Sequence, residues 1–387
     1  MTIYGCRGLQ RYFINQYCTL LGSMSGIIML IAIFASRETQ RQYALTLSRY
    51  IEAAGGNKTL VLWYKDLGRL IFWIKALFCP KSKDLSNAVE ELILEKKNSP
   101  KWFDASNAYW YVFKQIKTFE SKLLYITYSE ALVKNNINQL VIWNGLKFRQ
   151  KVVTIAAKDL EIPCHFIERG AFPNTTTLDS QGINFINSVP RDPSFYMKRD
   201  IQPFPIGCRF DSEKPECLPD NYIFVPFQVN IDSQVTLFSP WIKNMFSLVD
   251  QLLHAEIILG DEMPHIILKS HPACAQSYES LRNKVRETSQ KIFFVDEYAS
   301  DLLIKYSDAV MTINSSVGME GLLMRKKVIV LGQAFYDIKG ITLSSESLEE
   351  MILNLHRVQG WYPNEYLLSS FLDYLKYEYV VEGIWHT

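Results

Sequence analysis

The chain has 387 residues, enough for two domains of ordinary size. Hydrophobic residues make up 48% and charged residues 21%, a composition that buries a sizeable core and excludes global disorder. The formal net charge of +1 gives no overall basic field, and no RNA-binding signature is present, so we expect no nucleic-acid partner.

An apolar segment near the N-terminus, residues 20–38, has the sequence "LLGSMSGIIMLIAIFASRE". Its strongly apolar part, Gly26–Ala35, is only about half as long as a membrane-spanning helix. A polar loop, a helical pattern and a Gly-Gly stop follow it. The pattern therefore predicts that Ile27–Phe34 is the first strand of a β-α-β unit. An N-terminal anchor is the alternative, and no signal-peptide cleavage site stands out.

The rest of the first half continues the alternation of apolar runs and helical patterns. Strands are predicted near 59–63, 138–145 and 162–170, and a helix over about 148–160. This alternation is typical of a parallel sheet that helices cover on both faces. The stretch over 66–133 is helical and aromatic.

Lysine, arginine and aromatic residues mix in 61–82 and 101–122, as in "WYKDLGRLIFWIKALFCPKSK". Amphipathic helices that pack on a core explain this pattern. A membrane-surface or acceptor patch is the alternative.

Residues 171–220 are rich in turn-forming residues, and we place the domain boundary near 205–220. The N-terminal domain then covers 1–215 and the C-terminal domain 216–387. The second domain repeats the pattern of the first, with strands predicted at 222–229, 265–272, 291–297, 309–316 and 327–332. Helices are predicted at about 240–254 and 299–306, and again over the tail, 345–380.

The predicted fold class is α/β, with two Rossmann-like, doubly wound domains that face a cleft. This is the GT-B architecture, and we expect the C-terminal helices to cross back onto the first domain. Ligands of such sheets lie outside the carboxyl ends of the strands. Polar residues at those ends are therefore the candidate site residues.

The seven cysteines lack any C-x-x-C pair, which indicates a reducing, cytoplasmic compartment and argues against a structural zinc site. They are Cys6, Cys18, Cys79, Cys164, Cys208, Cys217 and Cys274.

One polar strand ending is Asn314-Ser315-Ser316, which precedes a predicted helix. A helix N-terminus with two hydroxyls suits a phosphate or carboxylate. The alternative is that a serine only caps the helix. A second ending, "LKSHP", places Lys269 and His271 on a neighbouring strand, where both can bind a phosphate. A lone histidine is otherwise often structural.

Two further endings carry carboxylates. Asp232 lies in the loop after the strand at 222–229, together with Gln228 and Gln234. It can act as a nucleophile or base, or it can cap a helix. Glu168 ends a strand of the first domain and can deprotonate an acceptor hydroxyl or pair with Arg169.

Four segments resemble the capsule polysaccharide biosynthesis family, which includes bacterial β-Kdo transferases of the capsule lipid linker. They span about 168–342 in order: "IERGAFPNTTTLDSQGINFINSVPRDPSFY", "VPFQVNIDSQV", "LKSHP" and "TINSSVGMEGLLMRKKVIVLGQAFYDIKGIT". Residues 1–135 carry little of this signature. Arg169 stands where the family often has an acidic or apolar residue, which leaves its role open.

The resemblance implies a GT-B transferase that uses CMP-Kdo, an activated acidic sugar, without a metal. The donor's phosphate or carboxylate would bind Lys269, His271, Asn314, Ser315 and Ser316. Glu320 would lie near the ribose, Tyr336 and Asp337 near the donor, and Gln228 and Gln234 in the same loops. Asp232 would be the nucleophile of a retaining reaction and Glu168 its acid/base. Asn144 and Arg169 would lie on the acceptor side.

The implied partners are the CMP-sugar donor and a lipid-linked or saccharide acceptor at the cytoplasmic face of the inner membrane. A transferase for CMP-sialic acid or CDP-glycerol keeps the same architecture and is the first alternative. A non-catalytic adaptor in polysaccharide export is the second.

Overall fold

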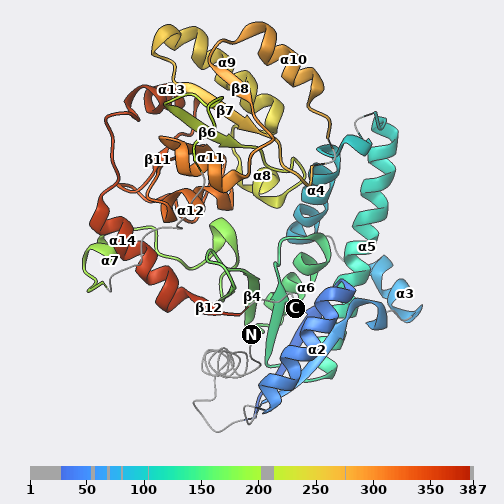
Figure 1. The fold of residues 1–387 in the computed structure, drawn as a ribbon. Helices are drawn as coiled ribbons and strands as arrows, with labels where there is room; N and C mark the ends of the chain where they lie inside the picture. The colour runs from blue at the N-terminus through green and yellow to red at the C-terminus, as the bar shows by residue number, and fades with distance from the viewer. Residues whose placement is uncertain are drawn as a thin grey trace. The chain divides into compact units, whose positions relative to one another are not determined.

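The computed structural model describes residues 28–53, 57–67, 70–79, 82–102, 104–201, 213–274 and 276–383. These residues form two compact units (Figure 1). The first unit contains the chain up to Leu94, Asp104–Ser188 and the residues from Tyr379 onward. The second contains Glu95–Phe103 and Val189–Glu378. Each unit has its own six-stranded sheet, and each is described by itself.

The sheet of the first unit has the strand order β12-β5-β4-β3-β1-β2. Strands β1 to β4 are parallel to one another. Strand β5 pairs antiparallel with β4, and β12 pairs antiparallel with β5. The strands are β1 (Leu30–Ala35), β2 (Lys58–Trp63), β3 (Gln139–Trp143), β4 (Cys164–Arg169), β5 (Thr175–Asp179) and β12 (Val380–Glu382).

Most helices of the first unit pack buried side chains on this sheet. In α2 (Glu38–Ala53), Ala44, Leu47 and Ile51 are buried at helical spacing. The other helices are α3 (Leu70–Phe78), α4 (Lys83–Lys97), α5 (Asn107–Lys134) and α6 (Phe148–Asp159), of which α5 packs against both α3 and α6. The short 3-10 turns η1 (Tyr64–Leu67) and η3 (Asn184–Ile186) also belong to this unit, whereas η2 (Pro100–Trp102) belongs to the second.

The sheet of the second unit is wholly parallel, in the order β11-β10-β9-β6-β7-β8. Alternate residues of β6 point to opposite faces, and all of them are buried, so both faces of the sheet are covered. The strands are β6 (Tyr222–Pro226), β7 (His265–Lys269), β8 (Ile292–Phe294), β9 (Ala309–Thr312), β10 (Lys327–Val330) and β11 (Leu343–Ser344).

Helices lie on both faces of this second sheet. On one face α9 (Met245–Leu259), α10 (Glu279–Thr288) and α13 (Leu348–Arg357) share a single core cluster with the strands. On the other, α11 (Ser300–Tyr306) and α12 (Ser316–Leu323) pack against β6, β9 and β10 (Figure 1). The remaining helices are α7 (Pro193–Met197), α8 (Ser233–Phe238) and α14 (Glu365–Tyr374), with η4 (Gly260–Glu262) after α9.

The predicted fold class, two doubly wound α/β domains, is confirmed. The strands expected from apolar runs are present in both halves. Within the first predicted strand, the described part begins at residue 28 and β1 starts at Leu30. The cleft between the domains stays a prediction.

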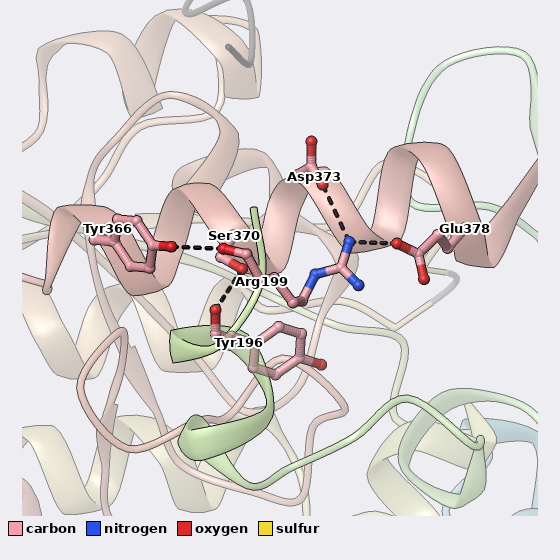
Figure 2. Close-up of polar contacts among 6 residues, drawn as sticks. All are labelled: Tyr196, Arg199, Tyr366, Ser370, Asp373 and Glu378. Atoms are coloured by element: carbon pink, nitrogen blue, oxygen red, sulfur yellow. Dashed lines mark hydrogen bonds and ion pairs between the residues drawn. The ribbon is translucent and has the colours of Figure 1, made fainter. Parts of the chain in front are cut away.

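The division between the units differs from the expected boundary at 215–216. Compact packing divides the chain at Ser188 and Val189, because α7 packs against α14 of the second unit. Ser370 Oγ donates to the carbonyl of the fully buried Tyr196, and Tyr366 Oη donates to the carbonyl of Arg199 (Figure 2).

Arg199 strengthens this attachment. Its guanidinium pairs with Asp373 at 3.2 Å and with Glu378, so it spans the last turn of α14 and the π-helix η5 (Leu375–Tyr379), as Figure 2 shows. The hydrogen bond to Glu378 is the largest cause of the raised pKa of Arg199. Residues 189–201 therefore belong to the second unit.

Three of the described strands were not predicted, and the shortest of them is β11. Residues 175–179 read as part of a polar loop, yet they form the buried strand β5. The helices over 345–380 were expected to cross back onto the first domain. Instead α14 belongs to the second unit, and strand β12 joins the first unit by pairing with β5.

Candidate functional site

The second sheet reverses its strand order between β6 and β9. From β6 the chain winds outward through β7 and β8, and it then returns to β9 on the other side of β6. Loops leaving β6 and β9 at their carboxyl ends therefore diverge, and this is where open α/β sheets bind ligands. Gln228 follows β6 and Asn314 follows β9, so both lie at this point.

Asn314 and Gln228 are buried and bonded to each other. Gln228 Nε2 donates to Asn314 Oδ1 at 3.0 Å, and the Asn314 backbone N–H donates to Gln228 Oε1 at 3.2 Å. Asn314 Nδ2 lies within hydrogen-bond distance of the carbonyls of Gln234, Phe238 and Gln333. These side chains thus hold three loops at the carboxyl edge of the sheet.

Ser315 caps α12. Its Oγ accepts from the Val317 backbone N–H at 3.2 Å, and its own N–H donates to Thr312 Oγ1. The capping alternative is therefore observed for Ser315, whereas Ser316 is exposed in the first turn. Glu320 lies exposed one turn further along the helix. The N-terminus of α12 presents a serine hydroxyl and a positive dipole end to solvent.

Two glycines allow α12 to pack closely. A Cβ at Gly318 would lie 2.4 Å from Tyr336 Oη, and one at Gly321 would lie 3.1 Å from a methyl of Val310 on β9. Tyr336 is buried and donates to the Ser315 carbonyl at 2.6 Å, which fixes the start of the helix. Burial raises the pKa of Tyr336. Tyr336 is therefore a positioning residue for the Ser315-Ser316 step.

Asp337 is the next residue. Its Oδ1 accepts from Thr342 Oγ1 at 2.7 Å and from Ser344 Oγ at 2.6 Å. Burial raises the pKa of Asp337 above its ordinary value, against the opposing effect of these hydrogen bonds and of Arg191. The carboxyl holds the loop before β11.

Asp232 is the N-cap of α8. One carboxylate oxygen accepts from the Gln234 backbone N–H at 2.9 Å, so the capping alternative is observed, and the residue is exposed. A cap fixes the carboxylate's direction without consuming both oxygens. Gln234 Oε1 is buried, and within the described part of the chain it has no hydrogen-bond partner. An orphan acceptor of this kind suits a hydroxyl or amino group of a ligand.

Lys269 and His271 lie in the loop after β7. Lys269 Nζ donates to the Asp296 carbonyl at 2.6 Å. His271 Nδ1 accepts from the Ala273 backbone N–H at 3.1 Å, so the neutral ring carries its proton on Nε2. His271, Ser270 and Arg282 line a pocket of about 250 Å³ together with Cys274, Gln276, Ser277, Tyr278 and Glu279.

Sequence reasoning missed the polar network beside this pocket. Arg282 pairs with Asp296, donates to Ser270 Oγ at 2.9 Å and lies over the Phe294 ring. Asp296 Oδ1 in turn accepts from the Ser270 backbone N–H. Arg282 lies on α10 and the partners that it joins follow β7 and β8, so no local motif marked it.

In the first unit the two polar strand endings meet. Asn144 Nδ2 donates to Glu168 Oε2 at 2.7 Å, and the Arg169 backbone N–H donates to Glu168 Oε1 at 2.9 Å. Asn144 has a φ of 65°, a conformation that asparagine tolerates. The residues predicted for the acceptor side, Asn144 and Arg169, therefore both contact Glu168.

A second polar group at this edge was also missed. Ser36, just after β1, donates to Gln40 Oε1 at 3.0 Å and accepts from Gln150 Nε2 at 2.9 Å. The first sheet reverses its order between β1 and β3, so this group lies at its switch point.

A second cavity lies at the opposite, amino edge of the second sheet. It has a volume of about 710 Å³ and is lined by charged residues that include His265, Asp308, Lys327 and His356. No residue of the expected donor site lines it. Among the described residues, no three His, Cys, Asp or Glu side chains are grouped to hold a metal ion.

Sequence comparisons identify the family. Residues 210–377 match the model of the family described as "Capsule polysaccharide biosynthesis protein". Protein FixF of Sinorhizobium fredii is 34% identical over 280 residues, which cover 70% of this chain and 67% of FixF. The capsule polysaccharide export protein KpsS of Escherichia coli is 22% identical over 55% of this chain and 70% of KpsS.

Among solved structures, the β-Kdo 2,7 transferase KpsC of Thermosulfurimonas dismutans aligns with 59% of this chain and 79% of its own. The identity is 18% and the TM-score 0.37. On the sequence matches, the chain belongs to the capsule polysaccharide biosynthesis family, which confirms the resemblance seen in its motifs.

Proposed function

We propose that this protein is a glycosyltransferase that moves Kdo from CMP-Kdo to a lipid-linked or saccharide acceptor during capsule or surface polysaccharide biosynthesis. The observation that carries the proposal is the convergence of Gln228, Asp232 and the Asn314–Ser316 step at the switch point of the second sheet. Family membership supports it independently. The acceptor would be met at the cytoplasmic face of the inner membrane.

Donor binding would use the N-terminus of α12. Ser316 and the dipole end of the helix suit the phosphate of CMP or the carboxylate of Kdo. The Nε2–H of His271 can donate to the leaving phosphate. Asn314 and Gln228 would act as positioning residues, because their side chains are engaged with each other and with the loops. Ser316, the N-terminus of α12 and His271 would together stabilise the negative charge on the leaving CMP. For this reason we propose that the transfer needs no metal ion.

Asp232 would act as the nucleophile of a retaining reaction. Its carboxylate attacks the anomeric carbon as the bond to the CMP phosphate breaks, which gives a Kdo-aspartyl ester and free CMP. The acceptor hydroxyl then attacks the same carbon, Glu168 takes its proton, and the Asp232 carboxylate leaves. Two inversions give net retention. The N-cap hydrogen bond would hold Asp232 in one direction for the attack.

Asp232→Asn tests this role cleanly, because an asparagine oxygen still accepts the Gln234 N–H and keeps the cap. We expect transfer from CMP-Kdo to fall by about 10³-fold or more while donor binding persists. Purified protein, CMP-Kdo and a synthetic Kdo-lipid acceptor would be followed by mass spectrometry, and quenched enzyme would be searched for a Kdo adduct on the Asp232 peptide. Asp261→Asn, the same change at an exposed residue of η4 in the second unit, is the matched control.

The same assay separates the alternatives. A product from CMP-sialic acid or CDP-glycerol, and not from CMP-Kdo, would reassign the donor. Binding of CMP-Kdo without turnover on any acceptor would favour the non-catalytic adaptor. Full activity in Asp232→Asn would reject the nucleophile assignment.

A further inference from the structure

Helix α3 is apolar on nearly every side, with the sequence LIFWIKALF. A helix of this kind normally belongs inside a core or against a membrane. Among the side chains that the structure describes in α3, one face is buried, with Phe72 and Ala76 at 7% and 0% exposure. Four large apolar side chains remain in water, at exposures of 54–83%: Trp73, Ile74, Leu77 and Phe78.

The apolar surface continues onto α5. Val112 and Ile116 are exposed and lie four residues apart, so they share a helix face with Phe119 three residues further on. The rings of Phe119 and Trp73 lie 5.7 Å apart, which joins this face to α3. The α3–α5 face, defined by Trp73, Ile74, Leu77, Phe78, Val112 and Ile116, is therefore continuous. Monomeric proteins rarely expose contiguous apolar surfaces unless they bind a partner there.

The charges of this face favour an anionic partner. Helix α3 and residues 107–119 of α5 contain Lys75, Lys114 and Lys117 and no Asp or Glu. Each of these lysines forms an ion pair at the rim, with Glu130, Glu90 and Glu120 respectively. Such surface pairs are worth little, so a lysine can exchange its glutamate for a lipid phosphate at small cost. Trp73 and the exposed Tyr111 add aromatic side chains, which favour the boundary between lipid headgroups and acyl chains.

We propose that the α3–α5 face docks this protein on an anionic lipid bilayer. The nine residues of α3 are too few to cross a membrane, and no helix in the described ranges is long and apolar enough to do so. A short helix with exposed Trp, Leu and Phe instead lies in the interface, with its apolar side chains inserted and nearby lysines among the headgroups. The lipid chemistry is recognised separately from the sugar donor, so this inference does not depend on the transferase reaction.

Vesicle flotation tests the docking. Full-length protein would be mixed with vesicles of phosphatidylcholine alone or with about a third phosphatidylglycerol, a composition that adds the anionic charge. We expect binding to the anionic vesicles and at least a tenfold weaker affinity in the variant Leu77→Glu/Phe78→Glu. The matched control is Ile257→Glu/Ile258→Glu, since these α9 residues are also exposed, at 79% and 64%, and belong to the second unit.

Three results would overturn the proposal. The first is absence of wild-type binding to either vesicle, and the second is equal binding by Leu77→Glu/Phe78→Glu. The third is a wild-type dimer that Leu77→Glu/Phe78→Glu dissociates, measured by light scattering, which would assign the face to a second copy of the chain. Unfolding curves of all variants should match, because the altered side chains are exposed. A matched curve ties lost binding to the face itself.

Discussion

Asn314 shows how one residue type can serve two purposes at a strand end. The sequence marked it as a ligand of the donor, but its amide group is bonded to the Gln228 side chain, to two backbone carbonyls of α8 and to one carbonyl in the loop after β10. A buried amide that satisfies several carbonyls is costly to remove, because each carbonyl then loses a partner without gaining water. Its contribution to the site is therefore the fixed position of Ser315 and Ser316.

Asn314→Ala should consequently lower the free energy of unfolding by about 2–4 kcal/mol. The measurement is urea denaturation followed by circular dichroism. Asn283→Ala, on the exposed side of α10, is the control and should change stability by less than about 0.5 kcal/mol. Equal effects of the two substitutions would show that the Asn314 network is not what holds the loops.

Asp337 makes stability depend on pH. Because burial raises its pKa in the folded state, the folded protein holds this proton more tightly than the unfolded chain does. Its contribution is therefore lost as pH rises from the ordinary value of 3.8 through the raised one. We expect Asp337→Asn, which can still accept from Thr342 and Ser344, to gain stability relative to wild type as pH rises across that window.

Asp192 provides a control of opposite sign. Its hydrogen bonds from Ser194 lower its pKa, so its stabilising effect is present above the ordinary pKa and lost as pH falls. Asp192→Asn should lose stability relative to wild type as pH rises. Denaturation of both variants from pH 3 to 7 would reveal the two trends, and parallel trends would contradict the assignment for Asp337.

At the scale of elements, α12 depends on the absence of a side chain. Alanine favours a helix over glycine by about 1 kcal/mol, but at Gly318 its Cβ would collide with the buried Tyr336. We expect Gly318→Ala to destabilise the protein by about 1–3 kcal/mol and to weaken CMP binding by displacing the Ser315-Ser316 turn. Thermal unfolding and calorimetric titration with CMP would measure both effects.

Gly360→Ala, in the turn after α13, is the control. A Cβ at Gly360 has no atom within 4 Å, so the substitution should be tolerated. If Gly318→Ala were as stable as wild type and bound CMP equally well, the close contact of α12 with Tyr336 would not be needed for the turn.

Local patterns predicted some elements and not others. The central strands β6, β7 and β9 were visible as apolar runs because both of their faces are buried. Strand β5, with the sequence TTTLD, was not predicted because it is polar and stands between turn-forming residues on both sides. In the structure Thr175 and Thr176 donate to the carbonyls of Phe172 and Gly383, which satisfies their hydroxyls in the interior.

Local patterns likewise predicted some residues of the candidate site and not others. Asn144 and Glu168 were singled out because each directly ends a strand, and the parallel pairing of β3 and β4 brought them together. Arg282 and Asp296 were missed, since their contact joins a helix to a loop after another strand. Pairings of this kind depend on tertiary packing, which no single segment encodes.

For the whole molecule, strand β12 ties the end of the described chain to the first unit. Val381 is 3% exposed and belongs to a core cluster with residues of β1 and α2. Val381→Asp places a charge in that core, and we expect hydrogen exchange to accelerate in β1, β3 and β4 while β6, β7 and β9 keep their protection.

Mass-spectrometric hydrogen exchange resolves these segments in one experiment. Tyr377→Asp, at a position that is 52% exposed in the second unit, is the control and should alter neither sheet. Faster exchange throughout both sheets in Val381→Asp would show that the two units unfold as one.

The pairing of β12 with β5 also sets an order of events during synthesis. Strands β6–β11 leave the ribosome before β12 does, so the second sheet can close while the first still lacks its last strand. Until then the outer edge of β5 presents unpaired N–H and C=O groups, which can recruit a strand of another nascent chain. The unit whose first strands are translated earliest is therefore completed last, and its yield should depend on how quickly β12 pairs with β5.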